Sequence, residues 1–212
     1  MVNILYKDEH IVVCEKEPGM LSQSDAKGDT GIPEELKTLL GVKEVFTVHR
    51  LDRPVGGLIV YALNGKAAAR LSSDNDFKKI YLAAVSGCPA PENGEMFDYL
   101  YKDAQKNKSF VVKTERKGAK PAKLAYELIE TMDTEKIGTV SLVRIELFTG
   151  RTHQIRVQFS SRGMPIAGDG KYGSRIKRND IALWAHKISF THPITLKRLE
   201  FVSEPKWKLS EI

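Results

Sequence analysis

The sequence predicts an α+β protein in which many short strands form a largely antiparallel sheet. Apolar runs of strand length recur along the 212 residues, whereas only three stretches have the spacing of an amphipathic helix. No repeat, low-complexity tract or linker rich in Pro, Gly and Ser divides the chain. We therefore expect one domain over residues 1–212.

The N-terminal part of the chain alternates predicted strands and helices. Two short strands around a "KDEH" turn, then a "PG" turn, are predicted by "ILYKDEHIVVCEKEPGM". A helix is predicted by "PEELKTLL", and strands by "EVFTV" and "GLIVYAL". A second helix is predicted by "NGKAAARLSSD", with Ala67, Ala68 and Leu71 on one face.

Strands dominate the prediction for the remaining chain. Four are predicted by "KKIYLAAVSG", "SFVVKT", "AKLAYELIETMD" and "TVSLVRIELF", and two more by "ALWAHKISFTHP" and "RLEFVSEP". The stretch "TGRTHQIRVQFSSRG" predicts a helix with Ile155 and Phe159 on one face. We expect Thr149 or Thr152 to cap this helix and Gly163 to end it.

The composition is that of an ordinary globular protein, with 42% hydrophobic and 28% charged residues. Cys14 and Cys88 stand far apart without a partner motif, so neither a disulfide framework nor a zinc site is indicated. The N-terminus has no signal-peptide pattern, and no apolar run approaches the ~20 residues of a membrane span. We predict a cytoplasmic protein with no membrane partner.

The chain is basic, with 33 Lys and Arg against 27 Asp and Glu, a net charge of +6. A basic excess favours a polyanionic partner, although many small enzymes are equally basic. The basic residues concentrate in 101–110, 113–123 and 170–180. These segments are either solvated loops or an RNA-facing surface.

The stretch "TVHRLDRP" (47–54) places His49, Arg50, Asp52 and Arg53 between two apolar flanks. An Asp in a loop commonly serves the backbone of a turn. Here arginines flank the carboxylate, and "PVGG" supplies the residues of an unusual loop. A carboxylate kept ionised by an arginine and shielded from water can act as a covalent nucleophile, so Asp52 is the first candidate site residue.

A second polar group, "GRTHQIRVQ", follows the apolar "VRIELF". Arg151 is placed at the start of the predicted helix and off its apolar face, where a carboxylate or an anion is its natural partner; solvated charges on a surface helix are the alternative. His153 and Arg156 lie near the same end. Tyr81, in "KKIYLAAV", is by itself most simply a core residue with its hydroxyl at the edge.

The histidines do not indicate a metal site. No pair among His49, His153, His186 and His192 has the spacing of metal ligands on a helix, and no Cys or acidic cluster accompanies them. The glycines of "PVGGL" and "GDGKYG" lack the spacing of a phosphate-binding loop. We expect no metal.

Taken together, "HRLDRPVGGL", "KIYLA" and "GRTHQIRVQ" resemble the RluA-type RNA pseudouridine synthases in order and approximate spacing. The opening strands, with Lys16 and Gly19, and the later "IAGDGKYG" and "LWAHKISFTHP" extend the resemblance over about residues 3–202. It implies a mixed, mostly antiparallel sheet with flanking helices and a central cleft. It also implies isomerisation of uridine in tRNA or rRNA without a cofactor.

The resemblance assigns roles to individual residues. Asp52 matches the essential catalytic aspartate, and Arg151 matches the arginine that pairs with it. Tyr81 matches the tyrosine that stacks on the target base and helps to remove its C5 proton. Arg50 matches the arginine that helps to flip the nucleotide out. The candidate residues for RNA contact and base flipping are Arg50, His49, His153, Gln154, Arg156 and Lys171.

The sequence departs modestly from the family. Val55 and Gly56 stand where many members have a Thr-Ser or similar pair, so hydroxyls beside the site are lost. Many relatives carry a small RNA-binding domain ahead of the catalytic one; the motifs here begin at the first residues, so we expect that domain to be missing. We expect a monomer.

Two other functions remain open at this point. A non-catalytic RNA-binding or RNA-folding protein would keep the same cleft without turnover. A hydrolase or phosphodiesterase using His49, Asp52 and His153 would consume water, but the sequence shows neither a second carboxylate nor the spacing of metal ligands. Neither Arg53 nor the site of nucleophilic attack, C1′ or C6, is assigned by the residues.

Overall fold

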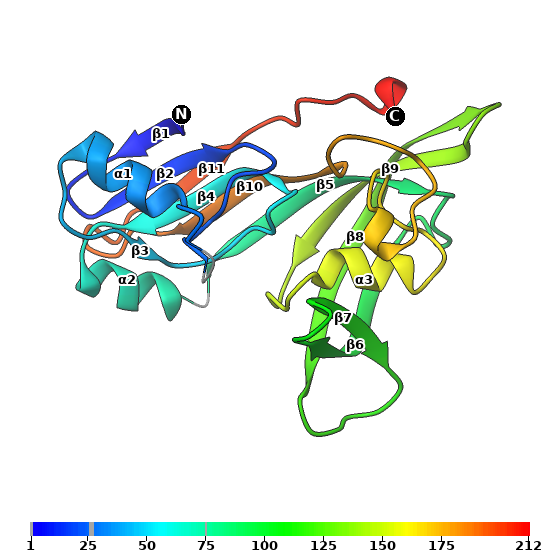
Figure 1. The fold of residues 1–212 in the computed structure, drawn as a ribbon, viewed down its shortest axis with the longest axis horizontal. Helices are drawn as coiled ribbons and strands as arrows, with labels where there is room; N and C mark the ends of the chain where they lie inside the picture. Colours follow the sequence, from blue (N-terminus) through cyan, green and yellow to red (C-terminus); the bar gives the residue numbers. More distant parts are fainter. Residues whose placement is uncertain (1, 26–27, 75) are drawn as a thin grey trace. The chain divides into compact units, whose positions relative to one another are not determined.

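The computed structural model describes residues 2–25, 28–74 and 76–212 (Figure 1). The chain forms two compact units. Unit 1 comprises Met1–Lys79 and Trp184–Pro205, and unit 2 comprises Ile80–Leu183 and Lys206–Ile212. The prediction of a single domain stays a prediction.

Unit 1 is a small sheet that carries two helices. Its strands run in the order β1-β2-β4-β10, with β11 beside β10 and β3 beside β4. The β4–β10 pair is parallel, and the other pairs are antiparallel. The elements are β1 (Asn3–Lys7), β2 (Ile11–Lys16), α1 (Ile32–Leu40), β3 (Phe46–Thr47), β4 (Gly56–Ala62), α2 (Gly65–Ser72), β10 (Leu183–Thr191) and β11 (Arg198–Val202).

Strand β4 is the centre of this unit. All seven of its residues are buried, which explains why its sequence is a continuous apolar run rather than an alternating one. Leu58, Val60 and Ala62 lie in a core cluster with Ala67 and Leu71 of α2. Figure 1 shows α1 and α2 on opposite faces of this sheet.

The two helices of unit 1 begin and end where the sequence indicates. Asn64 caps α2, since its side-chain oxygen accepts a hydrogen bond from the Ala67 N–H at 2.9 Å. Helix α1 has Pro33 in its first turn and ends at Gly41, whose φ of 65° is left-handed. Both predicted helices are confirmed, and the predicted strand "EVFTV" shortens to Phe46–Thr47.

Unit 2 is an antiparallel sheet in the order β5-β9-β8-β6-β7. Its core includes Leu100 and Ala122 of the sheet and Val157 of the helix α3, which packs against it. The elements are β5 (Lys78–Ser86), β6 (Asn93–Asp103), β7 (Lys108–Val112), β8 (Ala119–Thr134), β9 (Gly138–Leu147), α3 (Gln154–Ser160) and the 3₁₀ turns η1 (Gly170–Tyr172) and η2 (Leu209–Glu211).

Two features of unit 2 differ from the sequence-based expectation. Strand β6 was not predicted; Asn93-Gly94 is typical of a turn, and Asp98 stands in the middle of the strand, where it accepts hydrogen bonds from Gln158 and Arg162. Helix α3 begins at Gln154, not near residue 149, and neither Thr149 nor Thr152 caps it. The expected cap was wrong because Thr149 donates its hydroxyl to the Gln154 side chain instead, at 2.7 Å.

The α+β fold class is confirmed, with a mixed, mostly antiparallel set of strand pairs and few helices. In the described part of the chain, no helix is both long enough and apolar enough to cross a membrane. The predicted central cleft stays a prediction.

Gly57 gives a test of the packing in unit 1. Its φ is 111°, and a Cβ there would lie 2.4 Å from the Ala185 carbonyl oxygen. We expect Gly57→Ala to lower the free energy of unfolding by about 3 kcal/mol or more. Gly65→Ala is the matched control, because a Cβ at this helical position meets no atom within 4 Å. It should be neutral or slightly stabilising, and equal urea midpoints for the two variants would contradict this account.

Candidate functional site

Asp52 opens a tight turn that leads into β4. The Val55 N–H donates to the Asp52 carbonyl at 2.9 Å, and Pro54 stands inside the turn. Asp52 itself is half-buried, between the buried Leu51 and the exposed Arg53. The turn therefore holds a carboxylate at the margin of the unit 1 core.

A buried lysine binds the backbone carbonyls of this turn. Lys16, at the end of β2, is fully buried, and its ammonium donates to the carbonyls of Val55 at 2.7 Å, Arg53 at 3.0 Å and Glu17 at 3.1 Å. Burial lowers the pKa of Lys16 to about 8, while the nearby charges of Asp52 and Glu17 oppose the shift. Lys16 thus joins the backbone of the turn to β2 and lies within electrostatic reach of Asp52.

A serine hydroxyl holds the residue before Asp52. Ser22 accepts a hydrogen bond from the Leu51 N–H at 3.0 Å and donates to the Leu51 carbonyl at 2.8 Å. The Ser22 carbonyl in turn accepts from the Tyr61 hydroxyl of β4 at 2.9 Å. Because all three side chains are buried, this contact fixes the peptide that enters Asp52. Sequence reasoning missed Ser22, since a lone serine after a "PG" turn carries no distinguishing pattern.

The two arginines beside Asp52 have different surroundings. Arg53, which the sequence left unassigned, donates from Nε to the Gly19 carbonyl at 3.1 Å and forms an exposed ion pair with Asp29 at 3.3 Å. Its own carbonyl accepts from the Gly19 N–H at 2.7 Å. Arg53 therefore closes the 16–22 segment against the turn. Arg50 is exposed, as a residue that contacts RNA needs to be.

His49 packs inside unit 1. Its Nε2 accepts a hydrogen bond from the Val60 N–H at 3.2 Å, and its ring meets Phe77 edge-on at 5.3 Å. Burial, with the nearby charge of Lys79, lowers the pKa of His49 to about 3, so the ring is neutral at physiological pH. These contacts give His49 a structural role; its predicted contact with RNA stays a prediction.

In unit 2, Tyr81 lies in β5 with only 6% of its surface exposed. It pairs with Ile145 of β9, which pairs on its other side with Tyr126 of β8. The Tyr126 ring contacts Phe159 of α3 edge-on at 5.9 Å. Since paired residues share a face of the sheet, Tyr81 lies on the face that carries α3.

Arg151 lies in the segment between β9 and α3. Its Nε donates to the Pro121 carbonyl at 2.9 Å, and its N–H donates to the Gln154 Oε1 at 3.1 Å. Gln154, which is buried, also donates from Nε2 to the Lys123 carbonyl at 3.1 Å. Gln154 therefore positions the backbone of Arg151. The predicted contact of Gln154 with RNA stays a prediction.

His153 adopts a left-handed conformation, with φ of 55° and ψ of 26°. Such a backbone is uncommon for a residue with a side chain. The His153 Nδ1 lies 2.9 Å from the hydroxyl of the buried Tyr172, which also accepts a hydrogen bond from the Ser109 N–H at 2.8 Å. Tyr172, in the quoted "GKYG" stretch, was missed as the anchor of this segment.

Arg156 forms a buried ion pair with Asp169. The guanidinium donates from Nε at 2.7 Å and from a terminal nitrogen at 2.9 Å to the two carboxylate oxygens. It also lies over the Tyr172 ring at 5.1 Å. Both charges are almost fully buried, so Arg156 ties α3 to the turn that carries the exposed Lys171. Contact of Arg156 and Lys171 with RNA stays a prediction.

The predicted catalytic residues are thus distributed over both units. Asp52 belongs to unit 1, and Tyr81 and Arg151 belong to unit 2. In unit 2, Tyr81 shares its face of the sheet with α3, and Arg151 lies in the segment that enters this helix. The pairing of Asp52 with Arg151 stays a prediction.

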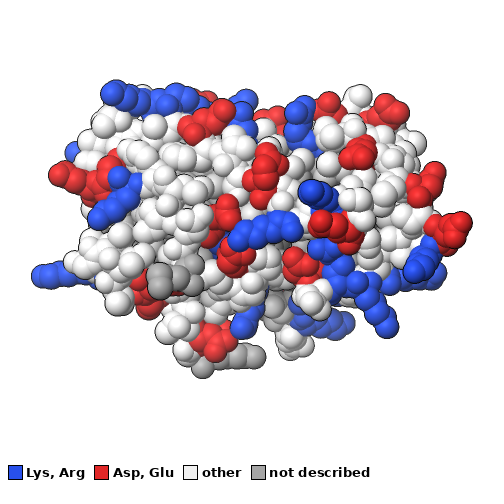
Figure 2. Space-filling model, turned by 90° about the horizontal axis from the view of Figure 1, so that it is seen from above, with Lys and Arg blue, Asp and Glu red and all other residues white. Residues whose placement is uncertain are grey.

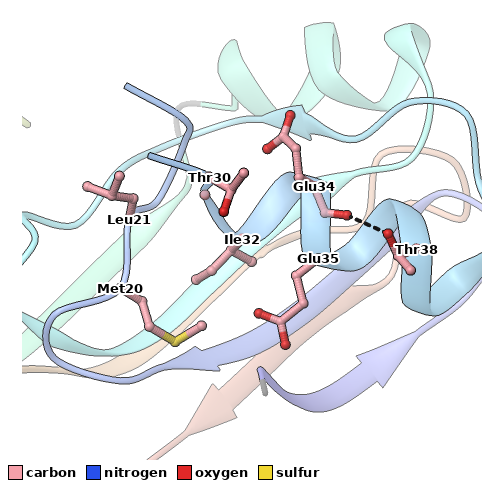
Figure 3. Close-up of a pocket in the computed structure, with 8 residues that line it drawn as sticks. Met20, Leu21, Thr30, Ile32, Glu34, Glu35 and Thr38 are labelled. Atoms are coloured by element: carbon pink, nitrogen blue, oxygen red, sulfur yellow. Dashed lines mark hydrogen bonds between the residues drawn. The ribbon is translucent and has the colours of Figure 1, made fainter. Parts of the chain in front are cut away.

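Unit 1 also contains a cavity of about 440 Å³ at the start of α1 (Figure 3). Its carboxylates are engaged: Glu34 accepts from the Ser24 hydroxyl, and Glu35 accepts from the Val2 N–H, both at 2.7 Å. Acidic walls are unsuited to an RNA phosphate, so we assign no substrate to this cavity. It is lined by Met20, Leu21, Thr30, Gly31, Ile32, Glu34, Glu35 and Thr38.

Within the described ranges, no three His, Cys, Asp or Glu side chains are grouped as metal ligands. That neither a metal nor a cofactor is needed stays a prediction.

Residues 10–161 match the family model described as RNA pseudouridylate synthase. This range contains Asp52, Tyr81 and Arg151. The chain belongs to the RNA pseudouridylate synthase family. The predicted family and the predicted class of enzyme, an isomerase, are confirmed at this level.

Individual relatives agree with this membership. The chain is 31% identical to the tRNA pseudouridine synthase C of Haemophilus ducreyi, over 98% of this chain and 93% of the relative. It is 30% identical to the dual-specificity RNA pseudouridine synthase RluA of Vibrio parahaemolyticus, over 90% and 78%. The chain spans 65% of the length of an uncharacterized RNA pseudouridine synthase of Bacillus subtilis, at 32% identity over 92% of this chain.

The fold agrees with that of a solved relative. The human RNA pseudouridylate synthase domain containing 1 protein superposes with a TM-score of 0.80, over 100% of this chain and 86% of the relative. Because the identity is 21%, this likeness supports the fold alone.

Lys16 makes the stability of the pseudouridylate synthase fold depend on pH. Between about pH 8 and 10.5, the unfolded chain keeps the proton that the folded Lys16 has lost, so the free energy of unfolding rises with pH across this window. The rise is at most about 1.4 kcal/mol per pH unit. In urea unfolding, we expect the free energy of unfolding of the wild type to rise from pH 8 to pH 10 relative to that of Lys16→Met.

Lys66→Met, at an exposed position of α2, is the control and should follow the wild type at every pH. A difference between wild type and Lys16→Met that stays constant from pH 7 to pH 10 would contradict the burial of the ammonium.

Proposed function

We propose that this protein isomerises uridine to pseudouridine in tRNA, rRNA or both, with Asp52 as the nucleophile. The observation that carries the proposal is the family match over residues 10–161, which includes "HRLD" with Asp52. The contacts of Lys16 and Ser22 with the residues around Asp52 support it, because a nucleophile must be held in one place while the base is bound.

The reaction exchanges one bond of the nucleoside for another. The N1–C1′ bond breaks, the base turns, and a C5–C1′ bond forms while C5 loses a proton and N1 gains one. Asp52 adds either to C1′ or to C6 and leaves again before the product departs. Product and substrate are isomers, so no oxidant, reductant or water is consumed.

Arg151 acts on the charge of Asp52, and Tyr81 acts on the base. Arg151 stabilises the carboxylate form of Asp52, since an opposite charge at short range favours ionisation. Tyr81 holds the detached base by stacking and helps to take the C5 proton. Its backbone is fixed in β5, where it pairs with Ile145 of β9.

RNA binding follows from exposed basic groups. Arg50 occupies the place of the flipped nucleotide, which compensates part of the cost of unstacking, a few kcal/mol. Lys171, also exposed, contacts the backbone. His49, His153, Gln154 and Arg156 act mainly by fixing the segments that carry the reactive groups. We propose a cytoplasmic monomer.

The proposal is tested with RNA that carries tritium at uridine C5. Total tRNA and rRNA from a strain lacking the gene should release tritium to water on incubation with wild type. Asp52→Asn should release none while binding RNA with unchanged affinity, because the amide keeps the shape but not the nucleophile. Asp133→Asn, at an exposed position of β8, should be fully active.

The same experiment separates the alternatives. If wild type releases no tritium from either RNA but still binds it, the protein is a non-catalytic RNA-binding member of the family. If the product incorporates oxygen from labelled water, it is a hydrolase.

Arg50 makes a second test of the mechanism. Arg50→Ala should slow tritium release about tenfold or more from a folded stem-loop, in which the target base is stacked. On a short unstructured oligonucleotide with the same target sequence, the loss should be small. An equal loss on both RNAs would contradict the assignment of Arg50 to base flipping.

A further inference from the structure

The β6–β7–β8 sheet of unit 2 carries a row of exposed aromatic side chains. Phe97 is 58% exposed, Phe148 is 49% exposed and Phe110 is 37% exposed. Tyr101 pairs directly with Phe110 across β6 and β7, and the Phe97 and Tyr99 rings meet edge-on at 5.7 Å. We call the five residues Phe97, Tyr99, Tyr101, Phe110 and Phe148 the aromatic stripe.

The stripe lies on the face of the sheet that α3 leaves uncovered. On the covered face, Leu100 packs with Val157 and Tyr172, and Ser109 donates its hydroxyl to the Thr152 carbonyl at 2.7 Å. Side chains alternate along a strand, so the odd-numbered aromatics of β6 and Phe110 of β7 point to the other face. Exposed aromatic patches of this kind mark interaction surfaces.

Cationic side chains lie close to rings of the aromatic stripe. Arg116 lies over the Tyr101 ring at 4.9 Å and Lys123 over Phe148 at 5.3 Å. Lys108 lies 5.8 Å from Phe110, but its ammonium is closer to Tyr172 of the covered face, at 4.9 Å, and donates to the Lys171 carbonyl at 2.6 Å. Lys123 also pairs with Phe97 in the β6–β8 register, which places Phe148 at the same end of the stripe. The surface therefore combines flat rings with positive charge.

The basic excess of the protein comes from this region. Residues 99–123 contain eight Lys and Arg against two Asp and Glu, an excess of six, equal to the excess of the whole chain. The rest of the chain is balanced. On the face drawn in Figure 2, many Lys and Arg side chains stand beside Asp and Glu side chains.

We propose that the aromatic stripe is a stacking platform for unpaired nucleotides of the substrate RNA that lie outside the target uridine. The inference rests on the proposed function and adds a second place of contact. Bases stack on exposed aromatic rings whatever their sequence, and adjacent cations bind the phosphates. A protein partner fits less well, since the cores of protein interfaces are depleted of Lys.

The acidic residues of the same face limit the platform. Glu95 forms an ion pair with Lys123 at 2.9 Å, and Glu127 bonds to Arg144. Both lie beyond Phe97 and Phe148 in the register, away from Tyr101 and Phe110. Asp103, two residues after Tyr101 on the same face of β6, forms an ion pair with Lys106 at 3.9 Å. Nucleotides are therefore expected over Tyr101 and Phe110 first.

The test uses a fluorescein-labelled 12-nucleotide single-stranded RNA of mixed sequence and the corresponding RNA duplex. The double variant Tyr101→Leu/Phe110→Leu keeps apolar bulk but removes both rings. We expect it to weaken binding of the single strand about tenfold or more and binding of the duplex less than twofold. Val202→Ala, at an exposed apolar position of β11, is the control and should bind both RNAs like wild type.

The salt dependence of RNA binding distinguishes the contribution of stacking from that of charge. The double variant should keep the slope of log Kd against log salt, because no phosphate contact is removed. Arg116→Gln/Lys117→Gln, at exposed basic positions beside Tyr101, should lower that slope while the rings remain. Near-ultraviolet and far-ultraviolet circular dichroism of each variant establishes that it folds.

Two results would overturn the platform. One is single-strand affinity in the double variant equal to that of wild type. The other is that the wild type is a dimer at micromolar concentration, whereas the double variant is a monomer with unchanged RNA binding. That result would make the stripe a self-association face. The proposed function is judged separately: Asp52→Asn should bind the single strand normally, and tritium release by wild type does not depend on the outcome here.

Discussion

The burial of the Lys16 ammonium among backbone carbonyls is the constraint on which the rest of unit 1 depends. A lysine loses its hydration when it is buried, and the three carbonyls of Glu17, Arg53 and Val55 replace it. They come from two segments, so the ammonium can be satisfied only when β2 and the turn after Asp52 are both in place. The turn that carries Asp52 is therefore part of the folding core rather than a loop attached to it.

Sequence patterns predicted the parts of the fold that local physics determines. Helix α2 has an Asn cap and an apolar face, and β4 has a continuous apolar run, so both could be identified from their own residues. Strand β6 could not, because Asp98 becomes acceptable in a strand only through Gln158 of α3 and Arg162, which follows this helix. The start of α3 was missed for a related reason: Thr149 bonds to Gln154, and His153 adopts its left-handed backbone beside Tyr172.

The polar residues of the predicted site show a second limit of sequence reasoning. Arg50 and Arg156 are the same residue type in quoted motifs, yet one is exposed and the other is buried against Asp169. Gln154 similarly has its side chain bound to Lys123, Thr149 and Arg151 of its own chain. A motif identifies which positions matter, whereas burial and partners decide whether a side chain touches the substrate or holds another residue that does.

The concentration of the basic excess in residues 99–123 has a kinetic consequence. Charges interact through solvent over about 8 Å at physiological ionic strength, so an approaching polyanion feels the nearest segment rather than the summed charge of the chain. Since the remaining residues are balanced in sum, attraction is strongest at residues 99–123, with a second basic segment at 170–180. Encounters with a polyanion then begin with a preferred orientation, and added salt slows its arrival.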